Sequence, residues 1–324
     1  MIGLKKEMPI ESLETVPCES VICRHCGSTN FVKRGHRKNK NHKVQRFGCK
    51  NCNHRFVLDE DGFQKMRYKP ELVTLTLDLY FKGLSLRKIT DHLTQFYRLK
   101  INHTTILRWI QKYVQIMKAY VDELKPQVSE QWHADEMVIN VDGYYHWLWN
   151  LMDARTRFLL ATQLTEQRET EDARRLFAEA KKRAGKRPEV IVTDGLQAYQ
   201  KAYMKEFWTL KKPRTEYVRL AKFEEKVNQN LIERFNGTTR ERNKVMRALD
   251  TDESAETFVD GFQVYYNFIR PHMGLGNKTP AEAAGVDLEL NGGNRWLELI
   301  RKGANHNNKN NQIGNDGTDV SKKV

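Results

Sequence analysis

Three acidic residues at separate points of the chain stand in contexts that suit a shared cation site. Asp194 follows an apolar, β-branched run at 190–193, and a buried strand that stops there lifts its carboxylate to the rim of a sheet. Glu233 lies in a predicted helix at 230–235, and Asp135 supplies a third acid upstream. Clustered carboxylates repel one another unless cations lie among them, and hard oxygen ligands suit Mg²⁺ or Mn²⁺. Such cations can stabilise the entering and leaving oxygens during cleavage of a phosphodiester.

Each of these acids also has a purely structural interpretation. An Asp before Gly, as at Asp194, is commonly a turn former, and a helical Glu beside Arg, as at Glu233, is commonly half of a solvated charge pair. Their joint position on the predicted topology favours the metal site. Alternation along the strand predicts that Glu136 points to the face opposite its neighbour Asp135.

Two Cys-x-x-Cys pairs predict a second metal site. Each pair forms a tight turn that presents two sulfurs, and four thiolates can close a tetrahedral Zn²⁺ site. A disulfide or free thiols are the alternative, and His25 or His54 could replace one sulfur. The predicted ligands are Cys23, Cys26, Cys49 and Cys52, and the fifth cysteine, Cys18, stands apart.

The segment between the two cysteine pairs is strongly basic. The whole chain has 55 Lys plus Arg against 41 Asp plus Glu, a net charge of +14, which favours a polyanionic partner such as DNA. We expect this segment to contact phosphates, and a solvated hairpin tip is the alternative. The residues concerned are Lys33, Arg34, Arg37, Lys38, Lys40 and Lys43.

From residue 70 to about residue 120 the apolar residues recur with the period of helices. Ser85, after a glycine, is a predicted cap of the second of three helices, and the third opens at Thr104. This order resembles a helix-turn-helix unit whose third helix would direct Thr104, Thr105 and Arg108 toward base edges. An ordinary helical bundle is the alternative.

The acids fall in a segment with the predicted order β-β-β-α-β-α-β-α. The strands are expected at 131–141, 144–152, 158–163, 190–193 and 216–220. This α/β order resembles the ribonuclease H-like core of DDE transposases and retroviral-type integrases, a mixed five-stranded sheet with flanking helices. The resemblance rests on Trp132-His133-Ala134-Asp135-Glu136, Thr193-Asp194-Gly195, Ile232-Glu233-Arg234-Phe235, Arg240, and the closing segments 266–272 and 278–282.

The resemblance implies an insertion-sequence DDE transposase that uses Asp135, Asp194 and Glu233 as catalytic metal ligands. Water would free a 3′-OH at each element end, that hydroxyl would attack target DNA, and Arg240 would hold a DNA phosphate. The 38 residues between Asp194 and Glu233 slightly exceed the family's usual spacing. Glu224 and Glu225 lie nearer to it but lack the Arg-Phe that follows Glu233.

The expected partners are element-end and target DNA and at least one further copy of the chain, since two ends must meet. An inactive DNA-binding regulator is the principal alternative, and a nuclease without joining activity is another. The predicted domains are a loose leader at 1–20, a zinc ribbon at 21–60, a helix-turn-helix domain at 68–125, the catalytic core at 130–285 and a disordered tail at 303–324. With no apolar run that resembles a membrane span or signal peptide, we expect a prokaryotic, cytoplasmic, nucleoid-associated protein with no membrane partner.

Overall fold

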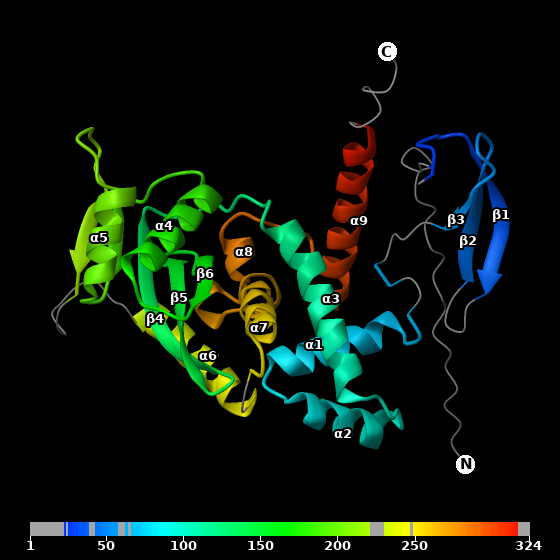
Figure 1. Ribbon diagram of the computed structural model, residues 1–324, viewed down its shortest axis with the longest axis horizontal. Coiled ribbons are helices and arrows are strands. Elements are labelled where there is room, and N and C mark those ends of the chain that lie inside the picture. Colours follow the sequence, from blue (N-terminus) through cyan, green and yellow to red (C-terminus); the bar gives the residue numbers. More distant parts are fainter. Residues whose placement is uncertain are drawn as a thin grey trace. The chain divides into compact units, whose positions relative to one another are not determined.

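The computed structural model describes residue 23 and residues 25–38, 43–57, 62–63, 66–220, 230–246 and 249–316 (Figure 1). The chain divides into two compact units, one made of 1–58 with 311–324 and the other of 59–310. The predicted leader, 1–20, lies outside the described residues. None of the described helices is long and apolar enough to cross a membrane.

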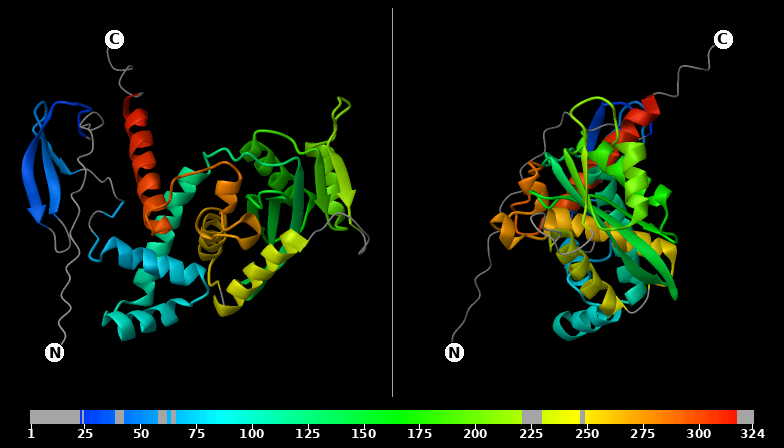
Figure 2. Two further views of the ribbon diagram at one scale, coloured as in Figure 1. Left: turned by 180° about the vertical axis from the view of Figure 1, so that it is seen from behind. Right: turned by 90° about the vertical axis from the view of Figure 1, so that its left-hand side faces the viewer.

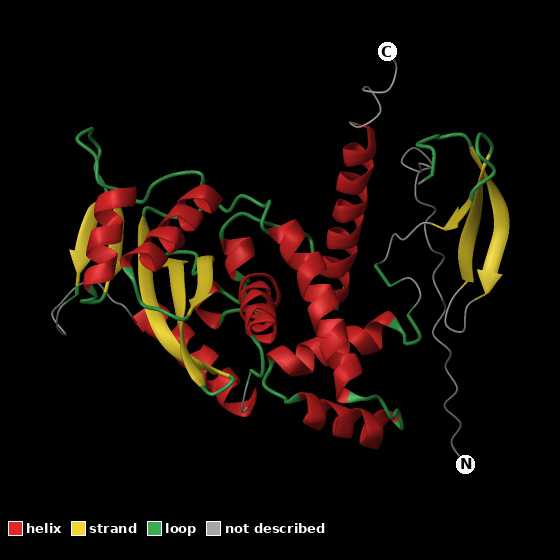
Figure 3. Ribbon diagram, viewed as in Figure 1, coloured by secondary structure: helices red, strands yellow, loops and turns green. Residues whose placement is uncertain are grey.

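The small unit contains a three-stranded antiparallel sheet, drawn in yellow in Figure 3. Its strands, in spatial order, are β1 (Phe31–Lys38), β2 (Lys43–Cys49) and β3 (Arg55–Val57). The described residues buried in its core are Cys23, Phe47, Cys49 and Phe56. A core of this size buries too little apolar area to hold a domain together, so units of this kind depend on a metal or on disulfides.

Three helices open the large unit and match the predicted helical region. They are α1 (Pro70–Phe81), α2 (Leu86–Tyr97) and α3 (His103–Val121). The predicted cap of α2 is confirmed, because the Ser85 hydroxyl accepts a hydrogen bond from the backbone N–H of Lys88. α3 begins one residue earlier than predicted because Asn102 caps it, accepting from Thr104 N at 2.9 Å.

The helical region and the sheet region share one hydrophobic core. α1 and α3 pack against α7 (Asp252–Val264), and both come close to its backbone at Gly261. A Cβ atom at Gly261 would lie 2.3 Å from Phe81 Cζ and 2.8 Å from Val114 Cγ2. The segments predicted as two domains, 68–125 and 130–285, therefore lie within one compact unit.

The sheet of the large unit has five strands in the order β6-β5-β4-β7-β8. β5 is antiparallel to both of its neighbours, whereas β7 and β8 run parallel to β4. The strands are β4 (Gln131–Val141), β5 (Tyr144–Asp153), β6 (Leu159–Thr165), β7 (Val190–Thr193) and β8 (Glu216–Arg219). This mixed sheet with flanking helices is the α/β core that was predicted, and the elements follow one another in the predicted order.

Helices cover both faces of this sheet (Figure 2). They are α4 (Thr170–Ala184), α5 (Gln197–Glu206) and α6 (Asn230–Met246). The ring of Tyr199 from α5 lies 5.4 Å from that of Trp149. Asn236 from α6 accepts a hydrogen bond from Asn150, the next residue along β5. Because successive side chains of a strand alternate, α6 lies on the face opposite α4 and α5.

The segment after α7 protects the sheet edge. Its elements are η2 (Tyr265–Ile269), η3 (Met273–Leu275) and α8 (Pro280–Ala283). The Asn267 amide donates to Leu159 O at 3.0 Å and accepts from Leu159 N at 2.9 Å, which satisfies backbone groups of edge strand β6. Thr279 and Glu282 form a reciprocal capping box on α8. The closing motifs that were noted in the sequence thus have structural roles.

The C-terminal segment differs from its prediction. Residues 303–324 were expected to be disordered, yet α9 (Arg295–Asp316) continues through the first part of them. Gly303 lies so close to α3 that a Cβ there would be 2.8 Å from Ile116 O, and His306 Nε2 lies 2.9 Å from Glu123 Oε2. Glycine is typical of flexible linkers, but Gly303 permits α9 to pack closely against α3. The amino-acid composition of this segment does not indicate that packing.

Candidate active site and zinc site

Strand pairing brings two of the three predicted acids together. In the parallel pair of β4 and β7, Ala134 lies opposite Thr193. The residues that follow, Asp135 and Asp194, therefore lie side by side where β7 ends. Asp194 Oδ1 accepts a hydrogen bond from Leu196 N at 2.9 Å, which orients the carboxylate at this edge. The carboxyl ends of parallel strands are a common place for ligands to bind.

Asp135 is held by helix α6. Asn236 Nδ2 donates to Asp135 Oδ2 at 2.7 Å, and Asn150 Nδ2 donates to Asn236 Oδ1 at 3.0 Å. The hydroxyl of Thr162 extends the chain of hydrogen bonds into β6, donating to Asn150 Oδ1 at 3.0 Å. Burial, reinforced by two neighbouring carboxylates, raises the pKa of Asp135 to about 7. A cation would relieve this concentration of negative charge.

Glu136 joins the two aspartates, although it was expected to point away from Asp135. One carboxylate oxygen from each of Asp135, Glu136 and Asp194 lies within 4.8 Å of the others. Alternation itself holds, because Glu136 pairs with Trp149 on the face of α4 and α5 while Asp135 faces α6. Since β7 stops beside them, both side chains reach its open end from opposite faces. We predicted the orientation of Glu136 from the alternation along β4 alone, which does not show where the neighbouring strand β7 ends.

Arg168 offsets part of the negative charge of the acid cluster. Its guanidinium forms an ion pair with Glu136, whose side chain is 3% exposed, and Nη2 lies 3.9 Å from Asp194 Oδ2. The same group lies 4.5 Å from the ring centroid of Trp147, and this cation–π contact holds it over the cluster. No spacing rule in the sequence indicates Arg168, since it lies in the loop between β6 and α4.

Glu233 is not among the acids that the structure brings together. It is exposed on α6, three residues before Asn236, and residues at that spacing lie on the same side of a helix. α6 is thus fixed against Asp135, but the acid cluster found among the described residues does not include Glu233. The alternative acids at 224 and 225 lie outside the described residues.

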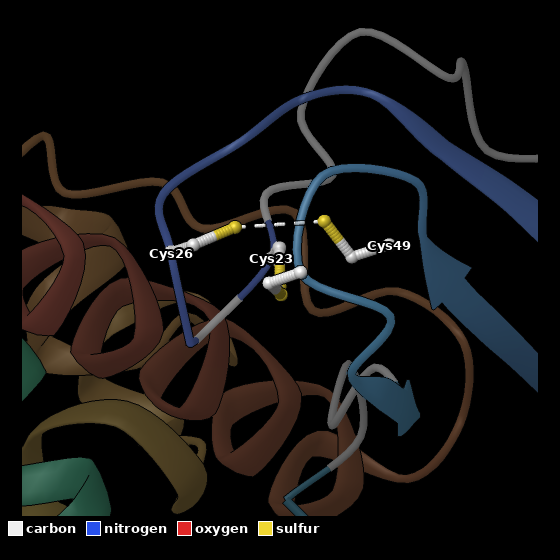
Figure 4. Close-up of side chains that lie close together, drawn as sticks. Cys23, Cys26 and Cys49 are labelled. Atoms are coloured by element: carbon white, nitrogen blue, oxygen red, sulfur yellow. Dashed lines mark hydrogen bonds between the residues drawn. The ribbon is translucent and has the colours of Figure 1, made fainter.

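The four predicted cysteine ligands gather in the small unit, and Figure 4 shows three of them. Cys23 Sγ lies 3.6 Å from Cys52 Sγ, and Cys26 Sγ lies 3.5 Å from Cys49 Sγ. Tetrahedral zinc with Zn–S bonds of about 2.3 Å separates its sulfurs by about 3.8 Å, so this arrangement fits Zn²⁺. The separations are too long for a disulfide bond of about 2.05 Å.

The two nearby histidines do not replace a sulfur. The rings of His25 and His54 stack on each other with centroids 5.0 Å apart, and the ligand group found among the described residues contains the four cysteines alone. Burial opposes ionisation of Cys49, but backbone N–H groups of Cys52 and Asn51 outweigh it and lower the pKa of this thiol to about 6, whereas burial and the neighbouring thiols raise the pKa of Cys52 to about 12. A thiolate is the form that binds zinc.

Comparison with known proteins identifies the sheet region. Residues 129–272 match the model of a family described as DDE domain. The chain is also 26% identical, over 133 residues, to the transposase for insertion sequence-like element IS431mec of Staphylococcus aureus. Residues 129–272 form a DDE domain.

The match to the Staphylococcus transposase covers 41% of this chain and 58% of that protein, so the chain spans little more than half of its length. A second match covers more of the chain. An uncharacterized protein of Methanocaldococcus jannaschii is 24% identical over 221 residues, which make up 66% of this chain and 94% of that protein. Among solved structures, the HTLV-2 integrase catalytic core domain in complex with magnesium aligns with a TM-score of 0.36 at 15% identity, covering 50% of this chain and 98% of that one.

Outside the DDE domain, the predicted DNA-contacting residues of the small unit lie on the hairpin of β1 and β2. Lys33, Arg34 and Arg37 are exposed on β1. Lys38 and Lys43 pair at the end of the hairpin, but their side chains, like the whole of Lys40, lie outside what the structure describes. The role of these residues in DNA binding stays a prediction.

The other predicted contacts lie on two helices of the large unit. At the start of α3, Thr104 and Arg108 are exposed and Thr105 is half-buried. Within the DDE domain, Arg240 is exposed on α6, four residues after Asn236 and therefore on the same side of the helix. A side chain must be exposed to contact DNA, and Thr104, Arg108 and Arg240 meet this condition.

Proposed function

We propose that this chain is an insertion-sequence transposase that binds element ends and cleaves and joins DNA strands in a metal-dependent reaction. The observation that carries the proposal is the approach of Asp135 and Asp194 at the end of β7, inside a DDE domain. The relative from Staphylococcus aureus, named a transposase, supports it. An acid cluster whose members are held close together in spite of their mutual repulsion also favours an enzyme over an inactive regulator, because carboxyl groups with raised pKa values gather at functional sites.

Asp135 and Asp194 would hold Mg²⁺ or Mn²⁺, with Glu233 as a third ligand contributed by α6. Carboxylate oxygens are the ligands that these cations prefer, and the pKa of Asp135 is raised by burial and, next, by the neighbouring carboxylates of Glu136 and Asp194, whose repulsion a cation would relieve. When bound, the cations would stabilise the charge that develops on the attacking and leaving oxygens of the phosphodiester.

The residues around the acids would position them. The Asn236 amide orients Asp135 and keeps the helix that bears Glu233 against the cluster. Arg168 holds Glu136 beside the aspartates. Arg240, on the same side of α6 as Asn236, would bind a phosphate of the DNA strand, since a guanidinium can donate two parallel hydrogen bonds to it.

We further propose that the cysteine cluster binds Zn²⁺ and that the chain contacts DNA through both of its units. Zinc would supply folding energy that the small apolar core of its unit lacks. The basic hairpin with Lys33, Arg34 and Arg37 would contact phosphates, and α3 would present Thr104 and Arg108 to bases. Pairing of two element ends would require at least two copies of the chain.

The test uses purified full-length chain and labelled duplexes that carry the repeats flanking its gene, with Mg²⁺ or Mn²⁺. We expect nicking at the repeat boundary by the wild type and none by Asp194→Asn, while both proteins bind the duplex equally well. Binding without nicking by either protein, across metals and salt concentrations, would instead support a DNA-binding regulator.

A further inference from the structure

A cavity of about 740 Å³ lies between the helical region and the end of α6 that is remote from the acids. This volume is within the range of about 300–1,000 Å³ that is typical of ligand sites. Its walls come from the end of α1, the first residues of α2 and α3, the last turn of α6 and the start of α7. The cavity therefore joins the predicted DNA-reading helices to a helix of the DDE domain.

The polar lining of this cavity is mainly basic. Arg87 and Lys88 contribute from the first turn of α2, and Lys244 faces them from the last turn of α6. All three are exposed, and Asp250 is the one acid among the described lining residues. His103 of α3 lines the same cavity. Three fixed positive charges against one negative charge favour an anionic occupant.

Helix termini add to this positive potential. Leu86 and His103, which line the cavity, are the first residues of α2 and α3. The first N–H groups of a helix lack acceptors within the helix and carry partial positive charge, so helix N-termini attract phosphates. Neither helix has an acidic residue in its first turn, whereas α4 and α7 each have two there.

A buried charge behind the cavity wall is an independent observation. Arg242 of α6 is 4% exposed, and no described residue accepts a hydrogen bond from any of its three guanidinium nitrogens. Its guanidinium instead lies 4.3 Å from the ring centroid of Tyr80, which lines the cavity. Burial lowers the pKa of Arg242 only to about 10, so it remains charged at neutral pH. The rings of Tyr80 and Phe258 offset only part of the cost of burying a cation that has no hydrogen-bond acceptor among the described residues, and an anion in the adjacent cavity would offset more of it.

We propose that this cavity holds backbone phosphates of the bound DNA, gripped jointly by α2 and α6. The inference rests on the proposed function and adds a site to it. Thr104 and Arg108 lie beside His103 and Leu107 on α3, so a duplex read by the exposed residues would bring its backbone to the cavity. Lys244 is eight residues beyond Asn236 on the same helix. A phosphate bound there would attach DNA to the helix that also contacts Asp135.

The experiment measures the affinity of the full chain for an element-end duplex as a function of salt concentration. Each lysine that neutralises a phosphate contributes about 0.9 to the slope of log affinity against log salt. Lys88→Gln and Lys244→Gln should each reduce the magnitude of that slope by about 1, and the double variant by about 2. When the salt concentration rises fourfold, the affinity of the wild type for the duplex should fall more than that of each single variant, by a factor of about three to four.

Lys186→Gln is the matched control, because Lys186 is paired with Glu130 at 2.5 Å and does not line the cavity. Its slope should equal that of the wild type. Unchanged slopes in both cavity variants, with DNA binding and metal-dependent nicking intact, would overturn the cavity proposal and leave the proposed function standing. Stabilisation of the wild type but not of Lys244→Gln by inorganic phosphate, again with unchanged slopes, would reassign the cavity to a small free anion and equally contradict a DNA site.

Discussion

Asn236 Nδ2 lies 2.7 Å from Asp135 Oδ2, and this hydrogen bond joins helix α6 to the strand that carries the first acid. The Asn236 oxygen is in turn engaged by Asn150, so the amide has one orientation available. The same helix bears Glu233 and Arg240, and this hydrogen bond adds a polar link to the apolar packing of Ile232 and Phe235 that holds the helix on the sheet.

Replacing Asn236 should weaken metal binding without unfolding the protein. Asn236→Ala removes the donor that orients Asp135, and loss of such a partner of a metal ligand typically costs 10- to 100-fold in metal affinity or activity. Titration of Mn²⁺ followed by calorimetry checks this. Thr238→Ala is the control on the same helix, because its hydroxyl bonds only to Arg234 O, and equal Mn²⁺ affinities for the two variants would contradict the role given to Asn236.

The acid cluster should make metal-free protein less stable as the pH rises. The folded-state pKa of Asp135 is about 7, above its ordinary value near 4, so folding takes up a proton between these values. Asp135 therefore leaves the free energy of unfolding unchanged below about pH 4 and lowers it increasingly as the pH rises to about 7. Asp135→Asn should therefore raise the melting temperature at pH 8 and leave it unchanged at pH 4. An equal change in melting temperature at pH 4 and pH 8 would show that ionisation of Asp135 is not the cause.

Arg168 should stabilise the fold through Glu136. Arg168→Gln leaves a carboxylate that is 3% exposed without its cation, and because Arg168 itself is a third exposed we expect a loss of about 1–3 kcal/mol in unfolding free energy. Urea denaturation of both single variants and of Arg168→Gln/Glu136→Gln forms a double-mutant cycle. The double variant should recover most of the loss, and strict additivity would show that the two residues do not interact.

The cysteine cluster should bind one zinc ion per chain. Cys49→Ser should lose that ion and unfold the small unit, while the large unit, which is compact by itself, retains its melting transition. Elemental analysis and calorimetry measure both effects. Cys18→Ser, outside the predicted ligand set, should retain full zinc content, and a zinc-free wild type that keeps its small unit folded would count against a structural metal.

The contact at Gly261 should tolerate no side chain. In Gly261→Ala the new Cβ would meet Phe81 Cζ at 2.3 Å, which should cost about 3 kcal/mol or more in unfolding free energy. Gly237→Ala on α6 is the control, since nothing lies within 4 Å of its Cβ position, and it should instead gain about 0.5–1 kcal/mol from helix propensity. Similar values for both variants would show that α7 can move away from α1.

Local patterns in the sequence were sufficient to predict most of the fold. Gln131–Val141 was predicted to the residue, because apolar alternation and the Asp-Gly turn after it are local signals. Cys49 and its partners were also predicted, because two short knuckles leave few other arrangements. These features depend on residues that are close in sequence.

The remainder depends on contacts between distant segments. Glu136 and Arg168 meet only because β7 ends beside β4 and the loop before α4 crosses that end, and neither event has a sequence period. Gly261 and Gly303 permit close packing against α1 and α3, which lie far away in the sequence, so no local pattern indicates their role. The helical region and the DDE domain share one core because α1 and α3 pack against α7.

Strand joining is the most direct test of whether this chain is a transposase that depends on Asp194. A duplex that ends in a ready-made 3′-OH at the repeat boundary is incubated with supercoiled plasmid, Mg²⁺ and either wild type or Asp194→Asn. We expect covalent joints between duplex and plasmid for the wild type and none for Asp194→Asn at equal DNA occupancy. Joints formed equally by both proteins would contradict the assignment of Asp194, and cleavage without joints by the wild type would indicate a nuclease in place of a transposase.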